Sequence, residues 1–106
     1  MLLHVALFRF HDWVADAELD ALEEALATFP ARVGCILDYR YGRDLGLREG
    51  NADYAIVALV AGPEELHRYL DHPAHHALLA DHLGALIAQR SAAQITVVPP
   101  IGEPAG

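Results

Sequence analysis

The sequence predicts an α+β fold in which a four-stranded antiparallel sheet carries two helices on one face. Three observations lead to this prediction. The chain has 106 residues, the length of one domain. Its apolar residues recur at every second position in some segments and at every third or fourth in others, as in strands and amphipathic helices. These segments follow the order βαββαβ, in which both helices pack on the same side of the sheet.

Residues 3–10 form the first predicted strand, because their side chains alternate between two faces that are both largely apolar. An amphipathic helix is predicted over residues 17–29, with apolar residues at spacings of three and four opposite acidic ones. We expect this helix to end before Pro30, which has no N–H to donate. Its apolar positions are Leu19, Leu22, Leu26 and Phe29.

Residues 35–41 form the second predicted strand, in which Tyr39 and Tyr41 share a face and are expected to pack against neighbours rather than line a pocket. A polar loop follows over residues 42–52, rich in Gly, Arg, Asp and Asn. Residues 53–61 form the third and most hydrophobic strand. These two strands and the loop complete the central part of the predicted sheet.

The last third of the chain begins with a helix from Pro63 to about residue 71, since a proline in the first turn and two following acids suit a helix start. After a break at Pro73, a second helical stretch is predicted over residues 74–89, and residues 94–98 form the fourth strand. The arrangement is the ferredoxin-like split βαβ fold. One domain therefore spans residues 1–98, and the proline-containing residues 99–106 form an extended tail.

Composition excludes several function classes. The formal net charge is −8, with seven arginines and no lysine, which disfavours nucleic acid and anionic membranes as partners. No apolar run is long enough to span a bilayer, and the N-terminus carries no recognisable export signal. The single cysteine, Cys35, excludes an intrachain disulfide. A cytoplasmic protein is the expectation.

The apolar character of both faces of the strands predicts self-association. The topology supplies helices for only one face of the sheet, so the other face would expose a large hydrophobic surface in a monomer. We therefore expect a homodimer that packs sheet against sheet.

The segment from Tyr69 to His76, Tyr-Leu-Asp-His-Pro-Ala-His-His, concentrates side chains that can transfer protons. Tyr69 and His75 are six residues apart, which in a straight helix places them about 120° from a common line. Pro73 should end or bend the helix near His72. Such a bend can turn both side chains toward one pocket.

In these motifs the chain resembles the stress-responsive dimeric α/β-barrel family, known as Dabb domains. The resemblance rests on residues 4–10 (His-Val-Ala-Leu-Phe-Arg-Phe), residues 42–44 (Gly-Arg-Asp), residues 53–57 (Asp-Tyr-Ala-Ile-Val) and above all residues 69–75. It covers nearly the whole chain in the correct order. It implies a homodimer whose two sheets close a barrel.

The resemblance also implies candidate site residues. The best understood enzyme that the chain resembles is olivetolic acid cyclase, a polyketide cyclase that uses no cofactor. Its catalytic histidine corresponds to His75, its tyrosine to Tyr69, and a histidine of its first strand to His4. A further pocket histidine, in its third strand, is replaced here by Ala55 or a neighbour of Ala55. We predict a pocket between sheet and helices, lined by these three catalytic residues and by Phe8 and Tyr54 as substrate-binding residues.

Three functions are compatible with this pocket. The leading hypothesis is a cofactor-independent acid/base enzyme, like the cyclase, that acts on a small hydrophobic carbonyl compound. The second is a stress-responsive dimer that binds a ligand or serves a structural role without catalysis. The third is a cofactor-free oxygenase of the wider barrel group. An enclosed cavity would favour an enzyme, and a filled one would favour a structural role.

Neither a cofactor nor a metal is predicted. The cluster His72, His75, His76 and His82 suggests a metal site, because His72 and His76 are four residues apart. Pro73 disrupts the helix between this pair, and the nearby acids suit a solvated surface equally well. His75 could also be a hydrogen-bonded residue that closes the helix kink, with Tyr69 as part of the core. His4 alone is more often a satisfied core histidine.

Overall fold

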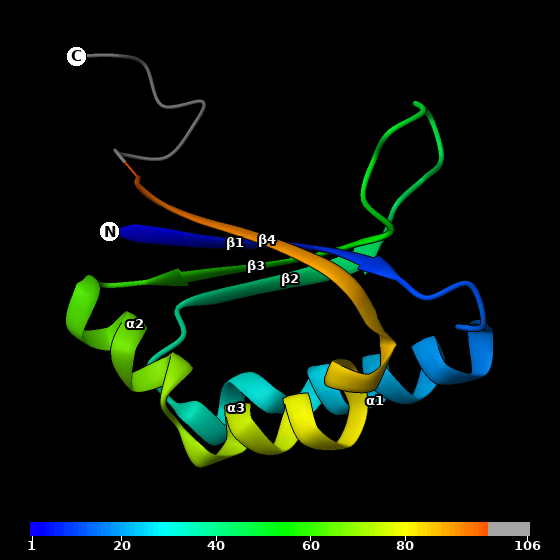
Figure 1. The fold of residues 1–106 in the computed structure, drawn as a ribbon. Coiled ribbons are helices and arrows are strands. Elements are labelled where there is room, and N and C mark those ends of the chain that lie inside the picture. The colour runs from blue at the N-terminus through cyan, green and yellow to red at the C-terminus, as the bar shows by residue number, and fades with distance from the viewer. Residues whose placement is uncertain (98–106) are drawn as a thin grey trace.

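The computed structural model describes residues 1–97. They form a four-stranded antiparallel sheet that is covered on one face by helices (Figure 1). The strands lie in the order β2-β3-β1-β4, which confirms the predicted ferredoxin-like fold. The strands are β1 (Leu2–Phe10), β2 (Asp38–Arg43), β3 (Tyr54–Val60) and β4 (Ile87–Thr96). The helices are α1 (Asp16–Val33), α2 (Pro63–Leu70) and α3 (Pro73–Leu78), followed by the π-helical turn η1 (Leu79–Leu83) and the 3-10 turn η2 (Gly84–Leu86).

The helix α1 extends beyond its predicted end. It begins after Ala15, whose backbone N–H donates to the Glu18 carboxylate at 3.2 Å. It continues through Pro30 and ends at Gly34, whose N–H donates to the Pro30 carbonyl oxygen. The φ of Gly34 is 81°, a left-handed conformation that glycine adopts without strain. The prediction that Pro30 ends the helix was wrong, because the proline costs one hydrogen bond in the last turn and the terminus is capped behind it.

The last helical region ends earlier than predicted. Helical structure stops at Leu86, and β4 begins at Ile87, where the sequence predicted helix as far as residue 89 and a strand only from residue 94. Strand β4 pairs antiparallel with β1 along its whole length, with a register irregularity between Arg9 and Phe10. The predicted boundary was wrong because alanine, glutamine and arginine favour a helix locally, whereas pairing with β1 decides the structure.

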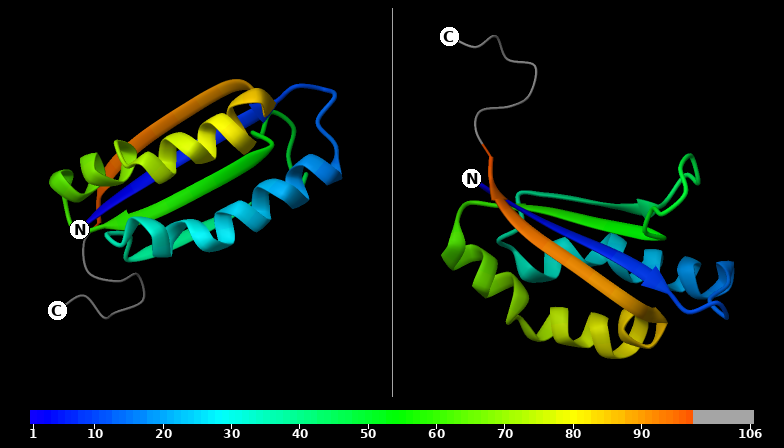
Figure 2. Two further views of the ribbon diagram at one scale, coloured as in Figure 1. Left: turned by 90° about the horizontal axis from the view of Figure 1, so that it is seen from below. Right: turned by 45° about the horizontal axis from the view of Figure 1, so that its top comes forward.

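The hydrophobic core lies between the sheet and the helices. Figure 2 shows α1 and the α3 region side by side across one face of the sheet, with β4 at its edge. The buried side chains of the strands alternate along β1 and β3, as the period of two requires. The buried core residues are Ala6, Phe8, Leu22, Leu26, Phe29, Tyr54, Ile56, Ala58, Val60, Leu66, Tyr69, Leu78, Leu83 and Leu86.

The opposite face of the sheet is not covered by any part of residues 1–97 (Figure 1). The cross-strand register places Leu3 beside Leu59 and Ile95, and Val5 beside Val57 and Ala93, on this face. The loop between β2 and β3 rises on the same side, and Leu45 and Leu47 on it are 82% and 76% exposed. An apolar surface of this kind on a sheet is typical of an interface.

None of the helices within residues 1–97 is long and apolar enough to cross a lipid bilayer. The tail predicted over residues 99–106 lies outside the described residues, as does Val98.

Candidate active site

A cavity of about 350 Å³ lies between the inner face of the sheet and the region from α2 to η1. It contains four of the five predicted site residues, namely the three candidate catalytic side chains and Phe8. Most of the remaining lining is aliphatic or aromatic, so the cavity suits a ligand with a hydrophobic body. The lining residues are His4, Ala6, Phe8, Tyr39, Ile56, Tyr69, Leu70, His75, Leu78, Leu79, Leu83 and Arg90.

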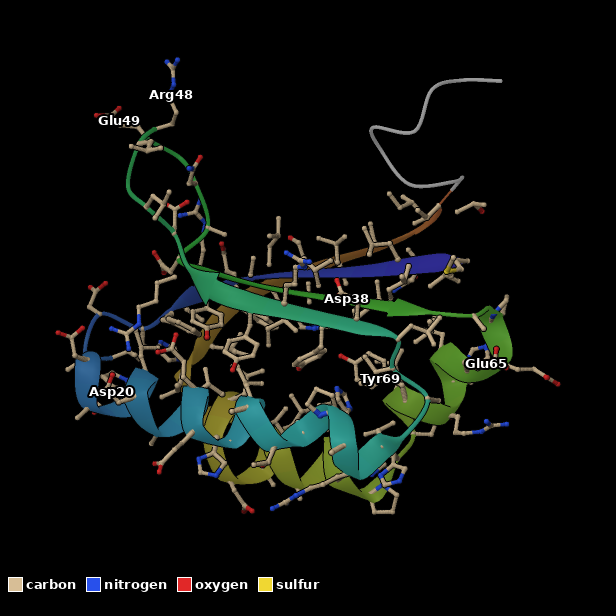
Figure 3. The ribbon with its side chains drawn as sticks, turned by 180° about the vertical axis from the view of Figure 1, so that it is seen from behind. Asp20, Asp38, Arg48, Glu49, Glu65 and Tyr69 are labelled. Atoms are coloured by element: carbon tan, nitrogen blue, oxygen red, sulfur yellow. The ribbon has the colours of Figure 1, made fainter. Side chains whose placement is uncertain are left out.

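The proline break brings Tyr69 and His75 together. Helix α2 ends at Leu70, and His72 adopts an extended conformation with ψ of 139° before Pro73 starts α3. The Ala74 N–H donates to His72 Nδ1 at 3.0 Å, so His72 caps the new helix. The Tyr69 and His75 rings then meet edge to face with their centroids 5.3 Å apart. Figure 3 shows Tyr69 in the space between the sheet and the helices.

His75 carries an unpaired nitrogen. Its Nδ1 atom is buried and has no hydrogen-bond partner within residues 1–97. Burial lowers the pKa of His75 from its usual value, and electrostatic interactions with His76 and Arg90 lower it further. A contact of the imidazole with the Leu70 backbone, outside normal hydrogen-bond geometry, and the charge of Asp71 oppose this shift without reversing it. The imidazole is therefore neutral at pH 7, as a general base must be.

Tyr69 is a neutral hydrogen-bonding group. Burial raises its pKa to about 12, so the phenol keeps its proton throughout the physiological range. The same effect raises the pKa of Tyr39, whose hydroxyl is buried and unpaired within residues 1–97. The two phenols are close enough that each affects the pKa of the other. The Tyr69 hydroxyl is a neutral hydrogen-bond donor of a residue that lines the cavity.

His4 is fixed in orientation by β4. The Gln94 Nε2 amide lies 2.8 Å from His4 Nδ1, and because an amide nitrogen donates, the proton of a neutral His4 belongs on Nε2. Burial lowers the pKa of His4, and the charge of Arg90 adds to the effect. The His4 ring also meets the Tyr69 ring edge to face, with centroids 5.8 Å apart. The three candidate catalytic rings thus form one contiguous group.

Tyr54 lies outside this cavity. Its buried hydroxyl donates to the Glu23 carboxylate at 3.0 Å, and the same carboxylate pairs with Arg43 at 2.9 Å. Arg43 also pairs with Asp16 and Asp20, so this group ties α1 to β2 and β3. The geometry therefore gives Tyr54 a packing position, and it does not support the predicted substrate-binding role.

Three residues of this region were missed by the sequence interpretation. Tyr39 lines the cavity, contrary to the expectation that it only packs against neighbours. Arg90 also lines the cavity, but it lies outside any predicted strand. Gln94, which orients His4, is only the first residue of the predicted fourth strand. The available signal was the period of two, which puts Arg90, Ala92 and Gln94 on one face of a strand. In the structure they lie opposite Phe8, Ala6 and His4 of β1.

No three metal-ligating side chains come close enough in residues 1–97 to hold one metal ion. His72, the first member of the suspected metal cluster, instead accepts a backbone hydrogen bond through Nδ1.

Fold and site together define a ferredoxin-like α+β protein with a small apolar cavity that contains a neutral histidine and a neutral tyrosine. The chain belongs to the stress-responsive A/B barrel domain family, Dabb, whose family model matches residues 2–97. No protein of curated function matches the chain at a significant level.

Several solved structures share the fold of this chain. A dimeric ferredoxin-like protein of unknown function from Thermobifida fusca is 38% identical, with a TM-score of 0.83 over 91% of this chain and 90% of that one. A hydroxynitrile lyase from Passiflora edulis has a TM-score of 0.77 at 12% identity, over 93% and 96% of the two chains. SnoaB, a cofactor-independent oxygenase from Streptomyces nogalater, has a TM-score of 0.72 at 22% identity, over 96% and 97%.

Proposed function

We propose that this protein is a cofactor-independent acid/base enzyme, similar to the polyketide cyclases, that acts on a hydrophobic carbonyl compound. One observation carries the proposal: the unpaired, neutral imidazole of His75 lies against the neutral phenol of Tyr69 in an apolar cavity. A base and a hydrogen-bond donor at one point are what enolisation requires.

In the proposed reaction, His75 removes a proton from the carbon next to a carbonyl group. The electron pair of that C–H bond becomes the enolate, and the Tyr69 hydroxyl donates a hydrogen bond to the enolate oxygen. In a substrate with a second carbonyl, the enolate carbon attacks it and forms the new C–C bond. The imidazolium of His75 returns its proton to the resulting alkoxide. His4, with its proton on Nε2, is a second donor beside Tyr69.

A purely structural role accounts poorly for His75. A buried polar atom without a partner costs about 1–3 kcal/mol, so a histidine retained only for packing is an unfavourable choice. The capping role that could have explained a histidine at the break is filled by His72. Tyr39 adds a second unpaired polar atom at the same cavity. Both residues line the cavity, so two buried polar atoms without partners in residues 1–97 belong to residues of its wall.

The comparisons are consistent with catalysis by protein side chains on this fold. The fold is shared with a hydroxynitrile lyase and with a cofactor-independent oxygenase. We further infer that the working form is a cytoplasmic homodimer. The uncovered apolar face of the sheet and the dimeric description of the Thermobifida fusca relative support the dimer.

The experiment uses acetophenone, a simple hydrophobic ketone, in D2O. Exchange of its methyl protons for deuterium reports α-deprotonation directly and is followed by proton NMR. We expect the protein to accelerate the exchange, and we expect His75→Gln to abolish the acceleration. His67→Gln, which changes an exposed histidine of α2 outside the cavity, is the matched control and should leave the rate unchanged.

Absence of acceleration, or equal acceleration by wild-type protein and His75→Gln, would contradict the proposal. Unfolding of His75→Gln, measured by circular dichroism, would instead point to the structural dimer as the function. Oxygen consumption with a hydroquinone that depends on His75, without proton exchange, would favour the cofactor-free oxygenase.

A further inference from the structure

Arg90 stands at the edge of the cavity on the strand β4. The register pairs it with Phe8, and the alternation of side chains puts it on the same face of the sheet as His4. It contributes to the cavity lining together with Tyr69 and His75, although its own side chain is exposed. The apolar cavity therefore carries one cationic group at its rim.

Within residues 1–97, Arg90 forms no ion pair and no hydrogen bond. Other arginines of the sheet do: Arg40 pairs with Asp38 at 2.9 Å, and Arg43 pairs with three carboxylates of α1. The chain has 15 acidic residues and a net charge of −8, so an arginine without an acidic partner stands out against its surroundings. A guanidinium has a planar set of donors that matches a carboxylate in two-point contact.

The positive charge of Arg90 reaches the whole candidate site. It contributes to the lowered pKa of both His4 and His75, and it opposes the rise in the pKa of Tyr69. The same field that disfavours a proton on the histidines favours a negative charge on a ligand in the cavity.

We propose that the cavity binds ligands that carry a carboxylate, with the apolar body inside the cavity and the carboxylate on the guanidinium of Arg90. For catalysis this inference rests on the proposed function and narrows the substrate to a hydrophobic carbonyl compound with an acid group. For binding it stands on Arg90 and the cavity alone.

The test compares 2-naphthoate with 2-naphthamide, two ligands of nearly the same shape of which only the first is charged. Their affinities are measured by isothermal titration calorimetry. We expect the wild-type protein to bind naphthoate at least ten-fold more tightly than naphthamide, and we expect this preference to weaken as salt is added. Arg90→Met should bring the naphthoate affinity down to that of naphthamide.

Two further variants exclude indirect effects. Arg90→Lys keeps the charge without the two-point contact and should retain part of the preference. Arg68→Met removes an exposed arginine of α2 that does not line the cavity, and the preference should be unchanged. Circular dichroism of each variant confirms that it is folded.

Equal affinity for the two ligands, no binding of either, or full naphthoate affinity in Arg90→Met would overturn the inference. The result is separable from that of the acetophenone experiment, because acetophenone carries no carboxylate and the calorimetry involves no chemical step. A protein that binds naphthoate through Arg90 but does not exchange the protons of acetophenone would keep this inference and lose the enzymatic one.

Discussion

The aromatic ring of Tyr69 and the imidazole of His75 lie edge to face across a break between two helices, with their centroids 5.3 Å apart and their planes at 84°. In one continuous helix, residues six positions apart do not share a face. The contact exists because α2 stops at Leu70 and α3 starts afresh at Pro73. The break in the helix is thus what creates the candidate catalytic pair.

The Tyr69 hydroxyl should matter for the rate and little for the fold. The Tyr69 ring packs in the core, and removal of the hydroxyl leaves that packing in place. Tyr69→Phe should therefore slow acetophenone exchange by about 100-fold, the scale of one positioned acid/base group, and change the free energy of unfolding by less than about 1 kcal/mol. NMR exchange and urea denaturation measure the two effects. A full rate in the variant would remove Tyr69 from the proposed reaction.

The two buried histidines predict how stability depends on pH. Burial lowers the pKa of His4 and His75 in the folded protein, so below the unfolded value of 6.5 the unfolded chain takes up protons that the folded protein resists. Stability attributable to these residues is complete above pH 6.5 and falls as the pH drops from 6.5 toward their folded pKa values.

Urea denaturation at pH 7.5 and pH 5.5 tests this expectation. The wild-type protein should lose stability on going to pH 5.5, and His75→Gln should lose less, since glutamine does not titrate. An equal loss in both proteins would show that His75 does not resist protonation. The acetophenone exchange catalysed by wild-type protein should likewise persist below pH 6.5, because neutral His75 is the active form.

The approach of Tyr69 and His75 to one cavity was predictable from the sequence because the signals that create it are local. A proline ends a helix through its own geometry, and His72, Tyr69 and His75 all lie within a few residues of Pro73. His4 was also placed correctly on the inner face, since the alternation of the first strand fixes its direction. Local chemistry and strand period are both readable from one sequence.

The position of Arg90 at the edge of the cavity was not predictable in the same way. Residues 85–93 are rich in helix-forming types, so the helix was predicted to continue past the true start of β4. Arg90 was therefore not predicted to lie in a strand. Only pairing with β1, a contact between the two ends of the chain, puts Arg90 opposite Phe8. Tyr39 was misjudged for a similar reason, because its surroundings come from α1 and α2.

Gly84 should be required for the shape of the cavity wall. Its N–H donates to the Leu79 carbonyl oxygen and closes the π-helical turn η1, whose residues Leu79 and Leu83 line the cavity. A Cβ atom at Gly84 would lie 2.7 Å from the Leu79 carbonyl oxygen, too close for backbone that cannot rotate away. Gly84→Ala should therefore destabilise the protein by about 1–3 kcal/mol.

The control for this substitution is Gly42→Ala. Gly42 lies in β2, and a Cβ atom there meets nothing within 4 Å. Its effect on the urea midpoint should be small, in contrast to that of Gly84→Ala. Equal midpoints for the two variants would show that η1 can shift to admit a side chain.

The uncovered sheet face should hold the dimer together. Val57 lies in the middle of this face, with Val5 and Arg40 as its cross-strand neighbours, and it is half-buried even in the single chain. Val57→Asp places a charge there, which desolvation makes unfavourable when a second sheet packs on it. We expect the wild-type protein to elute as a dimer in size-exclusion chromatography with light scattering, and the variant to elute as a monomer.

Thr28→Asp, a change at an exposed position on the helical side, should leave the dimer intact. Because a dimer gains stability by mass action, the melting temperature of wild-type protein should also rise with its concentration. A wild-type monomer, or a dimer that withstands Val57→Asp unchanged, would show that the apolar sheet face is not the subunit interface.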